Sequence, residues 1–171
     1  MARSSEMQQA LSFEGPLVEV VRSRKRRKTI SAREVDGVIR VSIPATMSKA
    51  DEAKWVDEMV RRFQRKASSS EVDLAERAAA LATRYRLPQP ESIRWVSNQA
   101  SRWGSCTPVD RSVRISDRLS EFPLWVLDYV LVHELAHLVV PSHNAEFKAL
   151  VNRYPKAERA LGYLMAKGLE G

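Results

Sequence analysis

The segment from Pro123 to Val140 limits the possible folds of this chain more than any other part, because it predicts a helix that is apolar on nearly every side. A helix without a polar face is buried inside a protein. The segment nevertheless carries His133, Glu134 and His137. Burying such groups without partners costs several kcal/mol. The chain must therefore fold around something that compensates them, and a bound dication would compensate all three together.

The spacing of the histidines supports a metal site. The chain has three histidines, His133, His137 and His143, which lie within eleven residues. Helix positions i and i+4 share a face about 5–6 Å apart, so the first two can reach one ion. Pro141 disfavours helix before it and lets the chain turn, which can bring His143 back as a third ligand. Three ligands leave the fourth position of a tetrahedral zinc ion open for water, and we expect one Zn²⁺ per chain.

Glu134 directly follows the first ligand, the position of the general base in an H-E-x-x-H pattern. Zinc lowers the pKa of a water to about 7 and polarises a carbonyl, so that Glu134 can accept a proton from the attacking water and pass it to the leaving amine. The sequence therefore predicts a zinc metallopeptidase, a hydrolase with Glu134 as its catalytic residue. The simpler alternative is three core histidines that are hydrogen-bonded to carbonyl groups.

Length and composition suit a single folded domain. The chain has 171 residues and 44% hydrophobic content, enough for one core with room for a small lobe. The single cysteine, Cys106, excludes an intramolecular disulfide and indicates a reducing compartment. The first residues contain no apolar run typical of a secretory signal. Charged and imidazole side chains within 123–140 disfavour a membrane span, so we expect a cytoplasmic protein without a membrane partner.

The N-terminal part of the chain predicts β-structure. Residues 1–16 lack periodicity and are expected to form a disordered tail. Residues 17–43 are rich in β-branched side chains with short alternations, and Asp36-Gly37 between two of these runs is typical of a hairpin turn. We therefore expect a three-stranded antiparallel meander over 17–43.

The remainder predicts mainly helices. Helical spacing indicates a helix over about 49–66 that opens with a Ser48/Asp51 capping box, followed by a polar break at 67–70. Ser70 with Asp73 opens the next helix, which ends at Leu87. Further helices are expected over 123–140, over 144–153 with Asn144 as its cap, and from 155 onward. In the last helix, Leu161, Leu164 and Met165 are expected to face inward. Short strands are expected at 93–96 and 113–115, on either side of a loop that contains 102–106.

Four sequence elements together resemble the YgjP-like metallopeptidases, a compact zincin family related to the SprT-like and WLM groups. Three are Arg102-Trp103-Gly104-Ser105-Cys106, Asp128-Tyr129-Val130-Leu131-Val132-His133-Glu134-Leu135-Ala136-His137-Leu138 and His143-Asn144-Ala145-Glu146-Phe147. The fourth is the basic stretch from Arg22 to Ile30, which resembles the family's opening strands. The resemblance spans about residues 17–155.

The resemblance implies the same site as the histidine spacing: zinc ligands His133, His137 and His143, and the catalyst Glu134. Two positions depart from the family pattern, Ser116 in place of an asparagine and Lys148 in place of a tryptophan. We expect both departures to alter the substrate groove rather than metal binding.

The expected fold is an α+β protein, in which the N-terminal antiparallel β-meander precedes a compact helical zincin-like metallopeptidase core with a small sheet. Residues 17–171 would form one YgjP-like domain. Within it, 17–46 would be the meander lobe and 47–171 the zincin core.

Substrate contacts are expected near the predicted site. Trp103, Gly104 and Ser105 could line a cleft whose flanking strand offers an edge to an extended peptide, or could form a tight glycine turn packed against the zinc helix. Tyr129, one turn before the first histidine, could stabilise an oxyanion or pack in the core. Cys106 is more simply an inert buried thiol than an inhibitory ligand or a redox-sensitive group. The expected partner is a peptide or protein substrate.

The net charge of +7 is concentrated in one segment. Six of the 28 basic residues lie between Arg22 and Lys28, and the remaining 22 nearly balance the 21 acidic residues. This segment could bind nucleic acid, as would suit a protease that acts on DNA-bound proteins. A charged edge strand that resists aggregation explains it more simply, since no interleaved aromatic residues offer stacking platforms. A further alternative is a non-catalytic module that zinc only stabilises.

Overall fold

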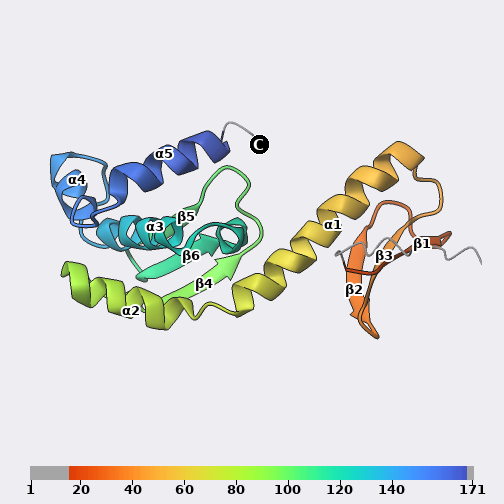
Figure 1. The fold of residues 1–171 in the computed structure, drawn as a ribbon, viewed down its shortest axis with the longest axis horizontal. Helices are drawn as coiled ribbons and strands as arrows, with labels where there is room; N and C mark the ends of the chain where they lie inside the picture. Colours follow the sequence, from red (N-terminus) through yellow and green to blue (C-terminus); the bar gives the residue numbers. More distant parts are fainter. Residues whose placement is uncertain (1–15, 169–171) are drawn as a thin grey trace, which may run out of the picture. The chain divides into compact units, whose positions relative to one another are not determined.

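The computed structural model describes residues 16–168 and shows a mixed α+β protein (Figure 1). The fold class expected from the sequence is therefore confirmed. The chain divides into two compact units, the first ending at Arg61 and the second beginning at Arg62. The predicted tail lies almost entirely outside the described residues. The expected organisation as one domain over 17–171, with a lobe up to residue 46, stays a prediction.

The first unit is built on a three-stranded sheet. Its strands are β1 (Val18–Ser23), β2 (Ser31–Val35) and β3 (Val38–Pro44). β2 and β3 form the predicted antiparallel hairpin, and its turn residues Asp36 and Gly37 have φ values of 52° and 76°. Such positive φ values suit the two central residues of a type I′ turn.

The expected antiparallel meander is wrong in one respect, because β1 pairs in parallel with β3 and the strand order is β1-β3-β2. The apolar residues Ile39, Val41 and Ile43 of β3 are all buried, whereas β1 and β2 are largely exposed. The most apolar strand therefore takes the centre of the sheet. Alternation of residue types does not reveal this order, since it shows which residues share a face but not which strands are neighbours.

A long helix, α1 (Lys49–Ser70), follows the sheet and crosses the boundary between the units. Its predicted cap is present, with Ser48 Oγ accepting a hydrogen bond from Asp51 N at 3.1 Å. The expected break at 67–70 is absent. The hydroxyl of Ser69 donates to the carbonyl of Lys66 at 3.0 Å, so the serine remains within the helix by bonding back to the preceding turn.

The described residues of the second unit form a sheet, four further α-helices and a 3-10 helix. These are α2 (Leu74–Tyr85), β4 (Ser92–Val96), β5 (Gly104–Thr107), β6 (Ser112–Ser116), η1 (Asp117–Glu121), α3 (Leu124–His137), α4 (Ala145–Val151) and α5 (Ala157–Gly168). β4 and β6 are the two predicted strands and pair in parallel, while β5 pairs antiparallel with β6. Part of the expected loop at 102–106 is therefore an edge strand.

A tight turn makes this additional strand possible. Arg111 has a φ of 52°, and Asp110 Oδ1 accepts a hydrogen bond from Ser112 N at 3.0 Å. The turn folds β5 back onto β6 as a hairpin, in the strand order β4-β6-β5. The short segment Gly-Ser-Cys-Thr of β5 has no alternating apolar pattern, which is why periodicity alone did not indicate it.

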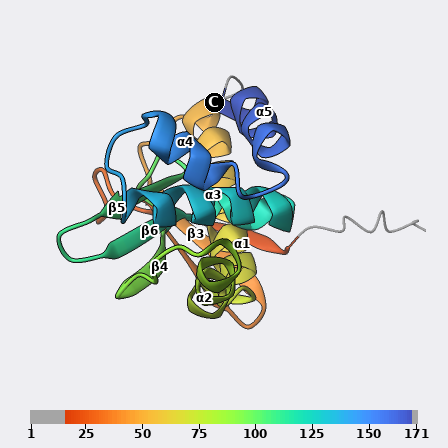
Figure 2. The same ribbon diagram turned by 90° about the vertical axis from the view of Figure 1, so that its left-hand side faces the viewer.

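The apolar helix α3 lies at the centre of the second unit (Figure 2) and contacts α2, α4, α5, β5 and β6. Most of its residues are buried, including Val126, Leu127, Leu131 and Leu135. The prediction of a buried helix is therefore confirmed, although the helix ends at His137, three residues before Val140. Within residues 16–168, no helix has the length and apolar character needed to cross a membrane.

Candidate functional site

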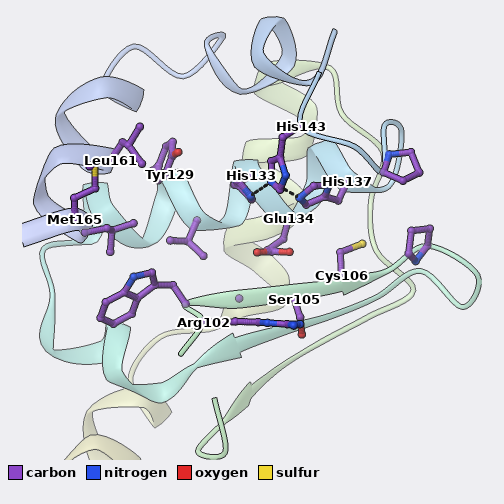
Figure 3. Close-up of a pocket in the computed structure, with 16 residues that line it drawn as sticks. Arg102, Ser105, Cys106, Tyr129, His133, Glu134, His137, His143, Leu161 and Met165 are labelled. Carbon is purple, nitrogen blue, oxygen red and sulfur yellow. Dashed lines mark hydrogen bonds between the residues drawn. The ribbon is translucent and has the colours of Figure 1, made fainter. Parts of the chain in front are cut away.

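The three histidines meet at one end of α3 (Figure 3). His133 and His137 project from one face of α3, and His143 reaches them from the segment between α3 and α4. The Nε2 atom of His143 lies 3.1 Å from Nε2 of His137 and 3.2 Å from Nε2 of His133. Three imidazole nitrogens from separate turns of the chain thus converge on one point.

This convergence fits a metal ion. Nitrogens bound to tetrahedral zinc at ordinary bond lengths are about 3.3 Å apart, close to the two contacts seen here. The Nδ1 atom of His137 lies 3.1 Å from the Val140 carbonyl oxygen, so Nδ1 carries the proton and Nε2 presents a lone pair. One proton on His143 could satisfy only one of its two Nε2 contacts, whereas a cation satisfies every lone pair. The donor set therefore suits zinc.

Phe147 supports all three imidazoles. Its ring centroid lies 4.8 Å from that of His133, 4.4 Å from that of His137 and 4.6 Å from that of His143. Asn144 caps α4 as predicted, with its Oδ1 accepting from Phe147 N at 2.9 Å. The cap therefore fixes both the supporting ring and the backbone next to His143. The sequence motif contains Phe147 but does not reveal this role.

Burial keeps the helical imidazoles neutral. Desolvation, together with the neighbouring His137 and His143, lowers the pKa of His133 to about 4. Desolvation also lowers the pKa of His137, against the opposing effect of its hydrogen bond to Val140. A neutral imidazole is the form that binds a metal. Both residues are therefore suited to ligation at neutral pH.

Glu134 lies between α3 and β5 and is only 5% exposed (Figure 3). Desolvation raises the pKa of its carboxyl to about 7, and Arg102 acts in the opposite direction. Gly104 of β5 lies directly against this side chain, since a Cβ added there would be 2.6 Å from Oε1 and 2.8 Å from Cγ of Glu134. Strand β5 can approach the glutamate this closely because residue 104 has no side chain.

A cavity of about 630 Å³ opens beside the histidines and Glu134. Its wall includes all four residues predicted for a substrate cleft: Trp103, Gly104, Ser105 and Tyr129. β5 forms one wall and is an edge strand of the described sheet. Sequence motif and cavity therefore coincide, although the predicted loop is a strand.

Two of these cleft residues have packing roles as well. The Trp103 ring lies 5.1 Å from that of Phe122. The Arg118 guanidinium lies 4.2 Å from the centroid of the Trp103 ring. Ser105 Oγ accepts a hydrogen bond from Gln99 Nε2 at 2.7 Å. Lining the cleft and packing against the core are therefore compatible for this motif.

Two further side chains in the wall stay protonated at neutral pH. Burial raises the pKa of the Tyr129 hydroxyl, and the ring of Tyr129 lies 6.0 Å from that of His133. Burial, followed by the charges of Glu134 and Asp110, raises the pKa of the Cys106 thiol to about 11. A protonated thiol is a poor nucleophile and a poor metal ligand. The raised pKa favours an inert thiol, and the role of Cys106 stays a prediction.

The predicted inward orientation of Leu161 and Met165 is wrong. These side chains of α5 are 47% and 62% exposed, whereas Leu164 is 6% exposed, and all three line the cavity. An apolar pattern cannot distinguish a side chain that faces the core from one that faces a cavity. Arg102, another residue of the cavity wall, was part of the motif without an assigned role.

The two departures from the family pattern are not part of the cavity wall. Ser116 is buried, and its Oγ has no hydrogen-bond partner among the described residues. Lys148 is exposed on α4. Neither residue lines the cavity, although Ser116 N donates a hydrogen bond to the carbonyl oxygen of Trp103, a cavity residue, at 2.9 Å. The expectation that both departures alter the substrate groove stays a prediction.

The basic stretch lies in the first unit and is partly engaged there. Arg22 donates to the carbonyl oxygens of Ala45 and Met47 at 3.0 and 2.9 Å and forms an ion pair with Glu52. Arg26 donates to the Thr29 hydroxyl at 3.4 Å. A role of Arg22–Lys28 in nucleic-acid binding stays a prediction.

Comparison with known proteins gives one family match. A family model described as YgjP-like, metallopeptidase domain, matches residues 11–164. Among solved structures, the chain is similar to the crystal structure of the metallopeptidase zymogen of Methanocaldococcus jannaschii jannalysin, with 16% sequence identity and a TM-score of 0.48. That alignment covers 56% of this chain and 97% of the other. No significant match was found among curated proteins.

Proposed function

The chain belongs to the YgjP-like metallopeptidase family, and from this premise we propose that it hydrolyses peptide bonds with one zinc ion held by His133, His137 and His143. The family makes it a peptidase that acts on peptides or proteins. The observation that carries the zinc proposal is the convergence of three imidazole Nε2 atoms, with contacts of 3.1 and 3.2 Å. The tautomer set by the Val140 carbonyl supports it.

Zinc, when bound, would polarise the substrate carbonyl and make a water acidic enough to attack it at neutral pH. Glu134 is the general base: its carboxylate accepts a proton from the attacking water and then delivers that proton to the leaving amine. Its position in the cavity wall beside the three histidines supports this role, and burial raises the pKa of its carboxyl above the usual range. The Tyr129 hydroxyl can donate a hydrogen bond to developing negative charge.

The substrate backbone would lie along β5. An edge strand offers unpaired N–H and C=O groups to an extended peptide, and β5 forms one wall of the cavity that contains Glu134. We also place the enzyme in the cytoplasm, because a single cysteine suits a reducing compartment.

The deciding variant is Glu134→Gln, which removes the base but keeps the size and polarity of the side chain. It should retain zinc at one ion per chain by elemental mass spectrometry and lose peptide hydrolysis by at least about a hundredfold. Glu146→Gln, an equal change at an exposed position of α4, should be fully active. Wild-type cleavage by Glu134→Gln would refute the mechanism.

Zinc content distinguishes the remaining alternatives. His133→Ala combined with His137→Ala should contain no zinc, and His143→Ala should bind it much more weakly. If zinc is bound and Glu134→Gln has no functional defect, the metal only stabilises the fold. If no zinc is taken up, the three residues are core histidines and the catalytic proposal fails.

A further inference from the structure

We propose that the end of the cavity at Tyr129 is an apolar substrate subsite, formed with Leu161 and Met165 of α5, that selects a large apolar residue next to the scissile bond. The inference rests on the proposed peptidase function of the same cavity and names the class of peptide that it accepts.

The first observation is the position of two apolar side chains on the surface. Leu161 and Met165 are 47% and 62% exposed, and their i, i+4 spacing places them on one face of α5. Both line the cavity. Exposed apolar side chains that gather around a cavity mark a binding site rather than a solvated surface.

The second observation is the distance from the reaction centre. Figure 3 shows Leu161 and Met165 beside Tyr129, at the end of the cavity away from Cys106. The ring of Tyr129 lies 6.0 Å from that of His133. The subsite therefore adjoins the histidines through Tyr129, and we infer that the selected residue is one that flanks the scissile bond.

The third observation is the distribution of charge along the cavity wall. Figure 3 shows Glu134 next to the histidines and Arg102 on the strand side of the cavity, whereas Leu161 and Met165 lie on α5. The floor at the Tyr129 end is completed by the buried residues Val130 and Leu164. A charged substrate side chain would lose water there without gaining a partner, whereas a leucine, methionine or phenylalanine would bury apolar surface.

The test uses the zinc-loaded full chain and short glycine- and serine-based peptides with one varied residue on either side of the cleavage position. At one of these positions, leucine, methionine or phenylalanine should raise kcat/KM by roughly tenfold or more over aspartate or lysine. Equal rates for apolar and charged residues at both positions would overturn the proposal.

Met165→Glu provides the sharper test, because it places a carboxylate in the subsite at an exposed position that the fold does not need buried. The Met165→Glu enzyme should shift its preference at the varied substrate position from leucine toward lysine or arginine. Ala166→Glu is the matched control, since residue 166 is exposed on the same helix and does not line the cavity. This control should keep the wild-type preference. An active Met165→Glu enzyme with unchanged preference would contradict the proposal.

Binding to Glu134→Gln separates this inference from the proposed function. The same peptides are labelled with fluorescein, and their binding to Glu134→Gln is measured by fluorescence anisotropy. The leucine peptide should have a dissociation constant roughly tenfold lower than that of the aspartate peptide. If the wild type cleaves nothing but this difference persists, the catalytic mechanism fails while the subsite stands. If the patch instead joins two copies of the chain, Met165→Glu will abolish a dimer in sedimentation without changing peptide preference, which overturns the subsite.

Discussion

At the scale of single residues, the contact between Gly104 and Glu134 defines how closely the sheet can approach the active carboxylate. A Cβ at residue 104 would overlap Oε1, Cγ and Cδ of Glu134. Gly104→Ala should therefore displace the carboxylate and lower kcat by at least about tenfold, while zinc binding is unchanged. Paired kinetics and zinc titration measure this. Ser105→Ala, the matched change at the next residue, should leave kcat within a factor of about three. Wild-type kcat in Gly104→Ala would show that Glu134 does not need this space.

The buried carboxyl of Glu134 also predicts a pH-dependent stability for the metal-free protein. Burial raises its pKa from the usual 4.5 to about 7, so the folded state favours the protonated form. The free energy of unfolding of the metal-free protein therefore falls by about 3 kcal/mol as the pH rises from about 4.5 through 7. Glu134→Gln mimics the protonated form. In the presence of a chelator, it should be about 3 kcal/mol more stable than wild type above pH 8 and equally stable below pH 4.5.

Urea unfolding of both proteins across this pH range measures the difference. Titration of His133 and His137 is common to the two proteins and cancels in the comparison. A stability difference that does not change with pH would mean that Glu134 is not buried in the metal-free protein.

At the scale of the elements, the cap of the short helix α4 directly follows His143, the proposed third ligand. Asn144 Oδ1 accepts from Phe147 N at 2.9 Å, and Phe147 lies against all three imidazoles. Asn144→Ala should destabilise the protein by about 1 kcal/mol and weaken zinc binding severalfold, because both His143 and Phe147 adjoin the cap. Competition with a chromophoric chelator gives the zinc affinity.

Asn144→Ser is the conservative control, since serine also caps a helix N-terminus. It should restore most of the zinc affinity that Asn144→Ala loses. If the alanine variant loses stability but binds zinc as tightly as wild type, α4 does not position His143.

At the scale of the whole molecule, the three proposed zinc ligands and every residue of the cavity wall lie in the second unit. An ion that binds only the folded protein raises the free energy of unfolding by about 2.7 kcal/mol when its concentration is a hundred times its dissociation constant. We therefore expect zinc to slow amide hydrogen exchange in residues 124–151 and to leave the β2–β3 hairpin unchanged. Hydrogen exchange with zinc and with a chelator measures both regions in one sample. Equal protection of both units would show that they unfold together.

Interactions between near neighbours in the chain are enough to predict the candidate site on α3. His133, Glu134 and His137 are fixed relative to one another by the helical repeat, so their placement follows from local spacing. The buried character of α3, the Asp36-Gly37 hairpin and the Asn144 cap also follow from interactions between near neighbours in the chain. Such features need no knowledge of the rest of the fold.

The surroundings of the candidate site follow from the packing of the whole fold. The parallel pairing of β1 with β3, the strand character of Gly104 and its fit against Glu134 depend on segments that are distant in sequence. The same holds for α5, whose Leu161 and Met165 face a cavity instead of the core. Side-chain periodicity specifies which residues share a face, but packing between elements specifies what that face meets.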